Sequence, residues 1–208
     1  VFFSEGRKVI YRQPERVYKM ELERDDVFAV HKGKGFIKNG TLIPTPMDFS
    51  KKNYASLSAL NQILKRLIFP DQFTKEESFD LTIEDYEFLK YWMSRTPPEV
   101  EVPFYDRDNY YDSYCKFFIY GDLKGEMSDQ IRIYNKVGLA FGTLTDVAYI
   151  KDHQGVEFLL AATVLVNHNQ IFNDGEYEYE DLGIPFLGAL GREVYEYESL
   201  KEGFELPR

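Results

Sequence analysis

Cysteine is almost absent from this chain, since Cys115 is the only one among 208 residues. A single cysteine excludes an intrachain disulfide and argues against a cysteine-based zinc site. Histidine is nearly as scarce: His31, His153 and His168 lie far apart, without the spacing of metal ligands, and are expected at the surface or in turns. We therefore expect neither a metal nor a cofactor. Cys115 has aromatic neighbours, which favours a buried and unreactive thiol.

Long apolar runs and an excess of positive charge are also absent. No run reaches the roughly 18 residues that a membrane span needs, and no signal-peptide pattern is visible. The formal net charge is −10. Nucleic acid is therefore not expected as a partner, because phosphate binding needs basic patches. The chain starts at Val1 rather than at a methionine, which suggests a processed or trimmed product.

Aromatic residues are abundant instead, with 16 tyrosines and 17 phenylalanines in a chain that is 44% apolar. This composition supports a substantial core, in one large domain or two small ones. Residues 1–54 are rich in turn residues and short apolar runs, which predicts a strand- and loop-rich extension or insertion. Residues 55–208 contain the clearer helix and strand patterns.

Two helices are predicted by start signals followed by apolar residues at helical spacing. Ser56 and Thr82 are suitable N-caps, and carboxylates follow Thr82 in the first turn, where they interact favourably with the helix dipole. The apolar stripes include Trp92 in the second helix, and Leu182 and Phe186 in a third helix near the C-terminus. The stripe of the second helix is expected to lie in the core. The helices are expected over residues 56–68, 82–94 and 180–200.

Three apolar runs joined by short connections predict an antiparallel meander. The last run is apolar enough to be covered on both faces. The aromatic segment 110–120 before the meander is compatible with either helix or strand, and is expected to form a core wall rather than a substrate cleft. The strands are expected over residues 131–135, 143–150 and 156–166. Together these patterns indicate an α+β fold, an antiparallel sheet with flanking helices.

The meander carries a short motif, Lys136-Val137-Gly138, directly after its first strand, and Asp146 follows ten positions after Lys136. A strand with Lys-Thr/Ser-Gly, a glycine-containing turn and a strand bearing this Asp resembles the class A β-lactamase and penicillin-binding serine hydrolase family. The order of helix pair, sheet and terminal helix is similar too. Val137 stands where the family has a hydroxyl residue, so one hydrogen-bond donor is missing.

The resemblance implies an acyl-serine site with a lysine that holds the substrate's carboxylate. That role falls to Lys136, the one catalytic candidate. Substrate would pair with the strand edge at Lys136, Val137, Gly138 and Leu139. Asp146 would be structural, near the site. The implied substrate is a small molecule or a cell-wall peptide, in a protein of the periplasm or a secreted one.

The other family motifs are not found in the expected order. Ser113-Tyr114-Cys115-Lys116 fits Ser-x-x-Lys, and the triplet 128–130 is similar to Ser-Asp-Asn, but both lie too close to Lys136. We therefore interpret the chain as the C-terminal portion of a longer serine hydrolase, with its nucleophile on an absent N-terminal part. One alternative is a non-catalytic binding module for a peptide or glycan on the same fold. Another is an unrelated α+β domain.

Overall fold

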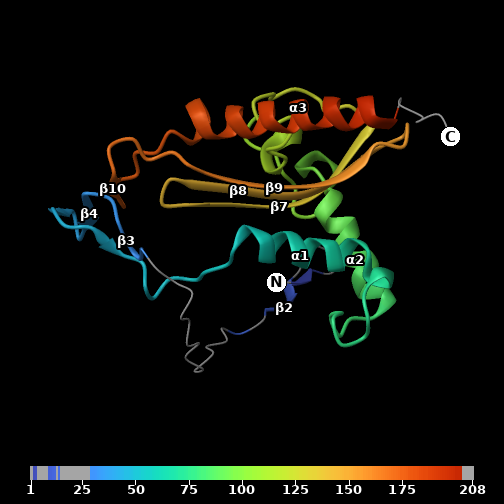
Figure 1. Ribbon diagram of the computed structural model, residues 1–208, viewed down its shortest axis with the longest axis horizontal. Coiled ribbons are helices and arrows are strands. Elements are labelled where there is room, and N and C mark those ends of the chain that lie inside the picture. The colour runs from blue at the N-terminus through green and yellow to red at the C-terminus, as the bar shows by residue number, and fades with distance from the viewer. Residues whose placement is uncertain (1, 4–8, 13, 15–28, 203–208) are drawn as a thin grey trace.

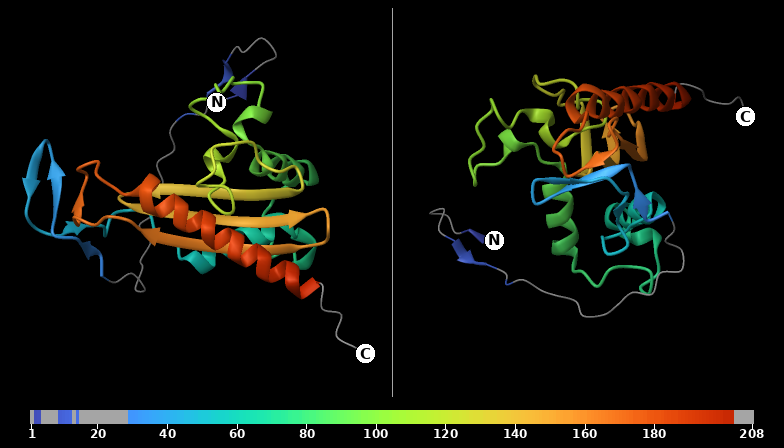
Figure 2. Two further views of the ribbon diagram at one scale, coloured as in Figure 1. Left: turned by 90° about the horizontal axis from the view of Figure 1, so that it is seen from above. Right: turned by 90° about the vertical axis from the view of Figure 1, so that its left-hand side faces the viewer.

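The fold is α+β, with an antiparallel sheet between helices (Figure 1). The computed structural model describes residues 2–3, 9–12, 14 and 29–202. Helix α3 lies along one face of the main sheet, while α1 and α2 lie on the other face. From above, α3 crosses the strands obliquely (Figure 2).

The main sheet is the predicted meander, in the order β7-β8-β9. The tight turn between β7 and β8 consists of Phe141 and Gly142, both with positive φ (54° and 77°). Such turns match the twist of the flanking strands. Asp152 closes the next turn, because its carboxylate accepts from the backbone N–H groups of Gln154 and Val156. The bounds are β7 Ile131–Ala140, β8 Thr143–Asp152 and β9 Glu157–Leu165.

The three predicted helices are present, and two begin with the predicted caps. Ser56 accepts from the N–H of Ala59, and Thr82 forms a capping box with Asp85. A single π-turn over Tyr179–Gly183 precedes α3. No helix in the described part of the chain is long and apolar enough to cross a membrane. The helices are α1 Leu57–Ile68, α2 Ile83–Ser94 and α3 Ile184–Glu202.

Three small sheets accompany the main one. Strand β10, Ile171–Phe172, pairs in parallel with β4. This sheet therefore joins residues from both sides of the boundary expected at residue 54. The short strands are β1 Phe2–Phe3 with β2 Val9–Tyr11, β3 His31–Lys32 with β6 Met47–Asp48, and β4 Gly35–Lys38 with β5 Thr41–Ile43.

The aromatic segment 110–120 is neither a regular helix nor a strand. It contains one 3₁₀ turn, Asp112–Cys115, and then turns against the α3 face of the sheet. Residues 117–120 are buried there, so the predicted core wall is confirmed for this half. Cys115 is only half-buried, although burial still raises the pKa of its thiol.

One expectation about burial was wrong. Trp92 is 44% exposed, so the apolar stripe of α2 is wider than the surface that covers it. Leu182 and Phe186, from the apolar set near the C-terminus, are more than half exposed. Strand β9 contributes to the cores on both faces, as its apolar run predicts, although it is an edge strand and no residue in it is fully buried. The central strand β8 is the buried one, because neighbours cover both its edges.

Helix α3 approaches the segment 117–120 at Gly191. A Cβ at this position would lie 2.3 Å from the backbone nitrogen of Ile119 and 2.9 Å from the carbonyl carbon of Phe118. Backbone atoms cannot move aside without separating the helix from the sheet. Alanine has a higher helix propensity than glycine, but the steric clash outweighs this gain. We therefore expect Gly191→Ala to lower the free energy of unfolding by about 1–3 kcal/mol, which urea unfolding measures.

Gly138→Ala is the matched control, because a Cβ there meets nothing within 4 Å. It should leave the urea midpoint nearly unchanged. Equal midpoints for Gly191→Ala and the wild type would contradict the close seating of α3.

Candidate functional site

Strand β7 presents alternate residues to the two faces of the sheet. Ile133 and Val137 pack into the core under α3, while Tyr134 packs into the core beside α1. Lys136 and Gly138 share the face of Tyr134, since residues two apart point the same way. The motif Lys136-Val137-Gly138 therefore lies inside the strand rather than after it, and Val137 turns its side chain away from Lys136.

Among the residues that the structure describes, β8 is the only strand that pairs with β7, so the outer edge of β7 has no strand partner there. The carbonyls of Ile133 and Val137 accept from the amino groups of Lys116 (3.0 Å) and Lys136 (2.6 Å). We infer that these two carbonyls face outward, and that Leu139, two residues on, has the same orientation. Lys116 covers the edge near Ile133. At the other end of the strand, Gly138, Leu139 and Ala140 are exposed.

A groove with a volume of about 650 Å³ opens beside this exposed half of β7, on the α1 and α2 side. Its walls are mostly apolar, and among the described residues Lys136 is the only charged one that lines it. This is the usual composition of a small-molecule or peptide site, an apolar wall with few polar groups. The lining consists of Ala55, Leu60, Ile63, Leu64, Leu67, Leu89, Met93, residues 136–140, Thr143, Thr145 and Val147.

Three of the sequence-predicted site residues meet at this groove. The Lys136 side chain is exposed and folds back onto the carbonyl of Val137, which leaves its amino group two further donors. Gly138 adds no bulk, so the strand surface beside Lys136 is open. Leu139 lies on the same open edge and is 49% exposed. Val137 borders the groove, but its side chain packs on the opposite side.

Asp146 does not face the groove. It pairs across from Val137 and is fully buried on the α3 face, where it accepts from the backbone N–H groups of Phe117 (3.2 Å) and Phe118 (3.3 Å). It also accepts from the side-chain amide of Asn135 (2.9 Å). Asp146 thus ties the segment 117–120 to the centre of the sheet.

Asn135 links Asp146 to a buried lysine. Its side-chain oxygen accepts from Lys116, and its amide also donates to the carbonyl of Cys115. The amino group of Lys116 makes two further hydrogen bonds, to the carbonyls of Met93 (2.7 Å) and Ile133 (3.0 Å). All three of its protons are therefore used, and we call Lys116, Asn135 and Asp146 the buried polar network.

Burial shifts both charges of the buried polar network towards their neutral forms. It lowers the pKa of Lys116 to about 8, against an opposing effect of Asp146. It raises the pKa of Asp146 to about 6, against the hydrogen bonds from Asn135 and the backbone. Both groups are still ionised at neutral pH. The network was missed in the sequence, where Lys116 was considered only within Ser-x-x-Lys.

Ser113 has no nucleophilic environment. Its hydroxyl is buried and donates to the carbonyl of Leu123, while the fully hydrogen-bonded Lys116 has no lone pair to act as a base. Ser128 lies outside the groove lining. At the groove itself, the hydroxyl of Thr145 pairs with that of Thr163 (2.8 Å). No hydroxyl–base pair faces the groove among the residues that the structure describes.

Comparison with known proteins gives no relative. No family model matches the chain. No curated protein and no solved structure matches it either. The similarity to serine hydrolases therefore stays a prediction based on the motif at 136–138 and on Asp146. The description of the groove as a binding site is independent of that similarity and depends on the groove's lining residues.

Proposed function

We propose that the groove beside Lys136 is the substrate-holding part of a serine hydrolase of the β-lactamase and penicillin-binding type. The observation that carries this proposal is that three features lie together at the groove. They are a lysine side chain, a glycine with open space beside it, and a strand edge without a strand partner. Lys136, Gly138 and Leu139 provide them beside an apolar groove. A carboxylate-bearing substrate needs these features to be held in an extended conformation.

Each part has a defined role in this proposal. Lys136 releases the carbonyl of Val137 and donates to the substrate's carboxylate, a charge-assisted hydrogen bond. The outward N–H and C=O groups of Leu139 pair with the substrate backbone. The apolar wall from α1 and α2 takes a side chain and excludes water. The serine that becomes acylated would come from polypeptide outside these 208 residues.

Labelling by a fluorescent penicillin tests the proposal on the protein translated from the whole coding sequence. We expect covalent labelling that survives denaturation and is prevented by excess unlabelled penicillin. We also expect the sequence upstream of Val1 to encode Ser-x-x-Lys at the start of an apolar helix. If translation starts at a methionine just before Val1 and the protein takes up no label, the hydrolase proposal is refuted.

The second candidate is a binding module for an extended peptide at the same groove. The orientation of Val137 favours it, because the position that bears the family's hydroxyl is packed under α3. A hydroxyl there would not reach a ligand beside Lys136. Reversible peptide binding without covalent labelling would select this candidate.

A further inference from the structure

A second, polar pocket lies at the other end of the same sheet face. The groove borders residues 136–145, whereas this pocket borders Arg132, Tyr134, Tyr149 and Lys151, with the end of α2 as its opposite wall. Its volume is about 460 Å³. The complete lining is Ile68, Phe69, Glu87, Lys90, Tyr91, Ser94, Arg95, Arg132, Tyr134, Tyr149 and Lys151.

The charge of this pocket opposes that of the whole chain. Its lining contains four cations, Lys90, Arg95, Arg132 and Lys151, and one carboxylate, that of Glu87. The chain as a whole carries a net charge of −10, so this gathering of cations is local. Cations that converge on a concave surface attract and hold anions.

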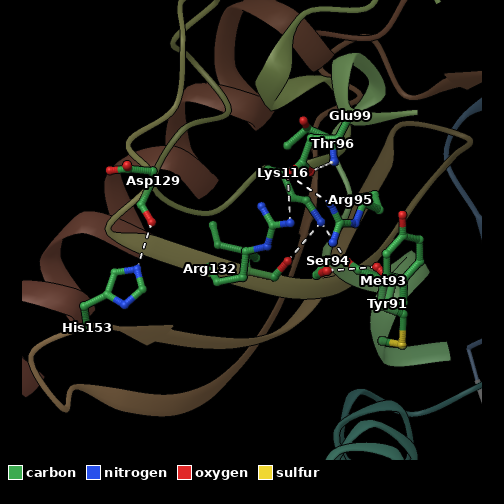
Figure 3. A network of polar contacts seen from close by, with 11 residues as sticks. Tyr91, Met93, Ser94, Arg95, Thr96, Glu99, Lys116, Asp129, Arg132 and His153 are labelled. Carbon is green, nitrogen blue, oxygen red and sulfur yellow. Dashed lines mark hydrogen bonds and ion pairs between the residues drawn. The ribbon is translucent and has the colours of Figure 1, made fainter. Parts of the chain in front are cut away.

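Glu99 accounts for part of the positive charge but not for all of it. One of its oxygens accepts from both Arg132 (2.8 Å) and Arg95 (3.4 Å), and the other accepts from the N–H of Thr96 (Figure 3). Burial acts to raise the pKa of Glu99, but these hydrogen bonds and the two arginine charges outweigh it, and the pKa is lowered. One carboxylate is therefore shared by two guanidinium groups. The buried Nε of Arg95 has no hydrogen-bond partner.

The two lysines extend the positive surface. Within the described part of the chain, neither Lys90 nor Lys151 has a carboxylate within ion-pair distance. Three carboxylates lie in or beside the pocket, those of Glu87, Glu99 and Glu157, and Glu157 is paired across the strands from Lys151. The four cations therefore exceed the carboxylates by one, and the two guanidinium groups favour a phosphate over a monocarboxylate.

Aromatic rings give the pocket flat surfaces next to these charges. Arg95 stacks over the ring of Tyr91 at 4.1 Å, and Lys151 lies over Tyr134 at 5.8 Å. The ring of Tyr149 packs beside Tyr134, and its hydroxyl is held by Glu157. A planar group of a ligand can pack against such faces while its anionic group meets the cations.

We propose that this pocket binds a phosphate monoester attached to a ring, with the phosphate held by Arg95, Arg132, Lys90 and Lys151. Guanidinium groups recognise phosphate oxygens in pairs, and ammonium groups add charge. Tyr91 and Tyr134 contact the ring, while the buried Tyr149 supports Tyr134 from behind. The site is separate from the groove at Lys136, so it stands whether or not the proposed hydrolase function is correct.

Titration calorimetry of the full chain with phenyl phosphate tests this proposal, with phenol and benzoate as ligand controls. Phenyl phosphate should bind more tightly than either control, and more weakly as salt is added. Lys90→Gln and Lys151→Gln should each weaken binding roughly tenfold, the loss of one charge-assisted contact. The matched control is Lys75→Gln, an exposed lysine in the α1–α2 loop that is not part of the pocket.

The outcomes separate clearly. Loss of affinity in Lys90→Gln and Lys151→Gln, with retention in Lys75→Gln and unchanged circular dichroism spectra, supports the site. Binding of benzoate as tight as that of phenyl phosphate overturns the preference for a phosphate. Absence of binding, or equal affinity in all variants, overturns the pocket as a phosphate site.

Discussion

Replacing Asp146 with alanine is expected to lower the free energy of unfolding by about 3–5 kcal/mol, enough to unfold many domains. Three donors face this carboxylate: the N–H groups of Phe117 and Phe118, and the amide of Asn135. All three would be buried without an acceptor, and each such group costs roughly 1–3 kcal/mol. Urea unfolding followed by tryptophan fluorescence measures the loss.

The control uses Asp146→Asn, which preserves volume but introduces an amide donor where only acceptors fit. It should cost less than alanine but still destabilise the fold. Lys116→Met should also destabilise, because it leaves the oxygen of Asn135 unpaired. The double variant Lys116→Met with Asp146→Ala should lose less than the sum of the single losses, since the residues share one network. Strict additivity would show that the two residues act independently.

The pH dependence of unfolding distinguishes the ionisation of Asp146 from its hydrogen bonding. Burial raises its pKa to about 6 in the folded state, above the ordinary 3.8. Between these values the folded state binds the proton more tightly than the unfolded state. The stability of the wild type relative to Asp146→Asn should therefore be highest near pH 4, and should fall as the pH rises through 6. A difference that is constant between pH 4 and 7 would contradict the raised pKa.

The regular elements were predictable because their signals are local. Ser56 and Thr82 cap helices in the way their sequence suggests, and Gly142 lies in the turn between two strands of the meander. The meander needed only neighbouring runs of suitable length. Periodicity along the chain determines such features, and no distant partner is involved.

The unpredicted features depend on which surfaces meet. Lys116 is 17 residues before Ile133 and 23 after Met93, and only the fold makes their carbonyls its acceptors. Trp92 has helical core spacing, but it is 44% exposed and packs on Phe88 and Tyr91 of its own helix. The parallel pairing of β10 with β4 joins segments more than 130 residues apart. The groove itself is a gap between α1, α2 and β7, which no single segment encodes.

Lys136→Ala is expected to reduce covalent labelling of the complete protein by a fluorescent penicillin roughly 10- to 100-fold. This corresponds to losing one charge-assisted hydrogen bond, about 1.5–3 kcal/mol. Lys136 is exposed at the groove, and within the described part of the chain its side chain makes one hydrogen bond, to the carbonyl of Val137, so its removal costs the fold little. The labelling rate at subsaturating probe is the quantity to measure.

Two comparisons make this result specific to the carboxylate. Lys75→Ala removes an exposed lysine away from the groove and should label at the wild-type rate. A penicillin whose carboxylate is esterified should label the wild type slowly, and Lys136→Ala should slow it little further, since the contact is already missing. Equal sensitivity of both probes to Lys136→Ala would mean that the lysine acts on the nucleophile rather than on the substrate. Unchanged labelling of the free acid would remove Lys136 from the site and leave the apolar wall and the edge of β7 as the binding surface.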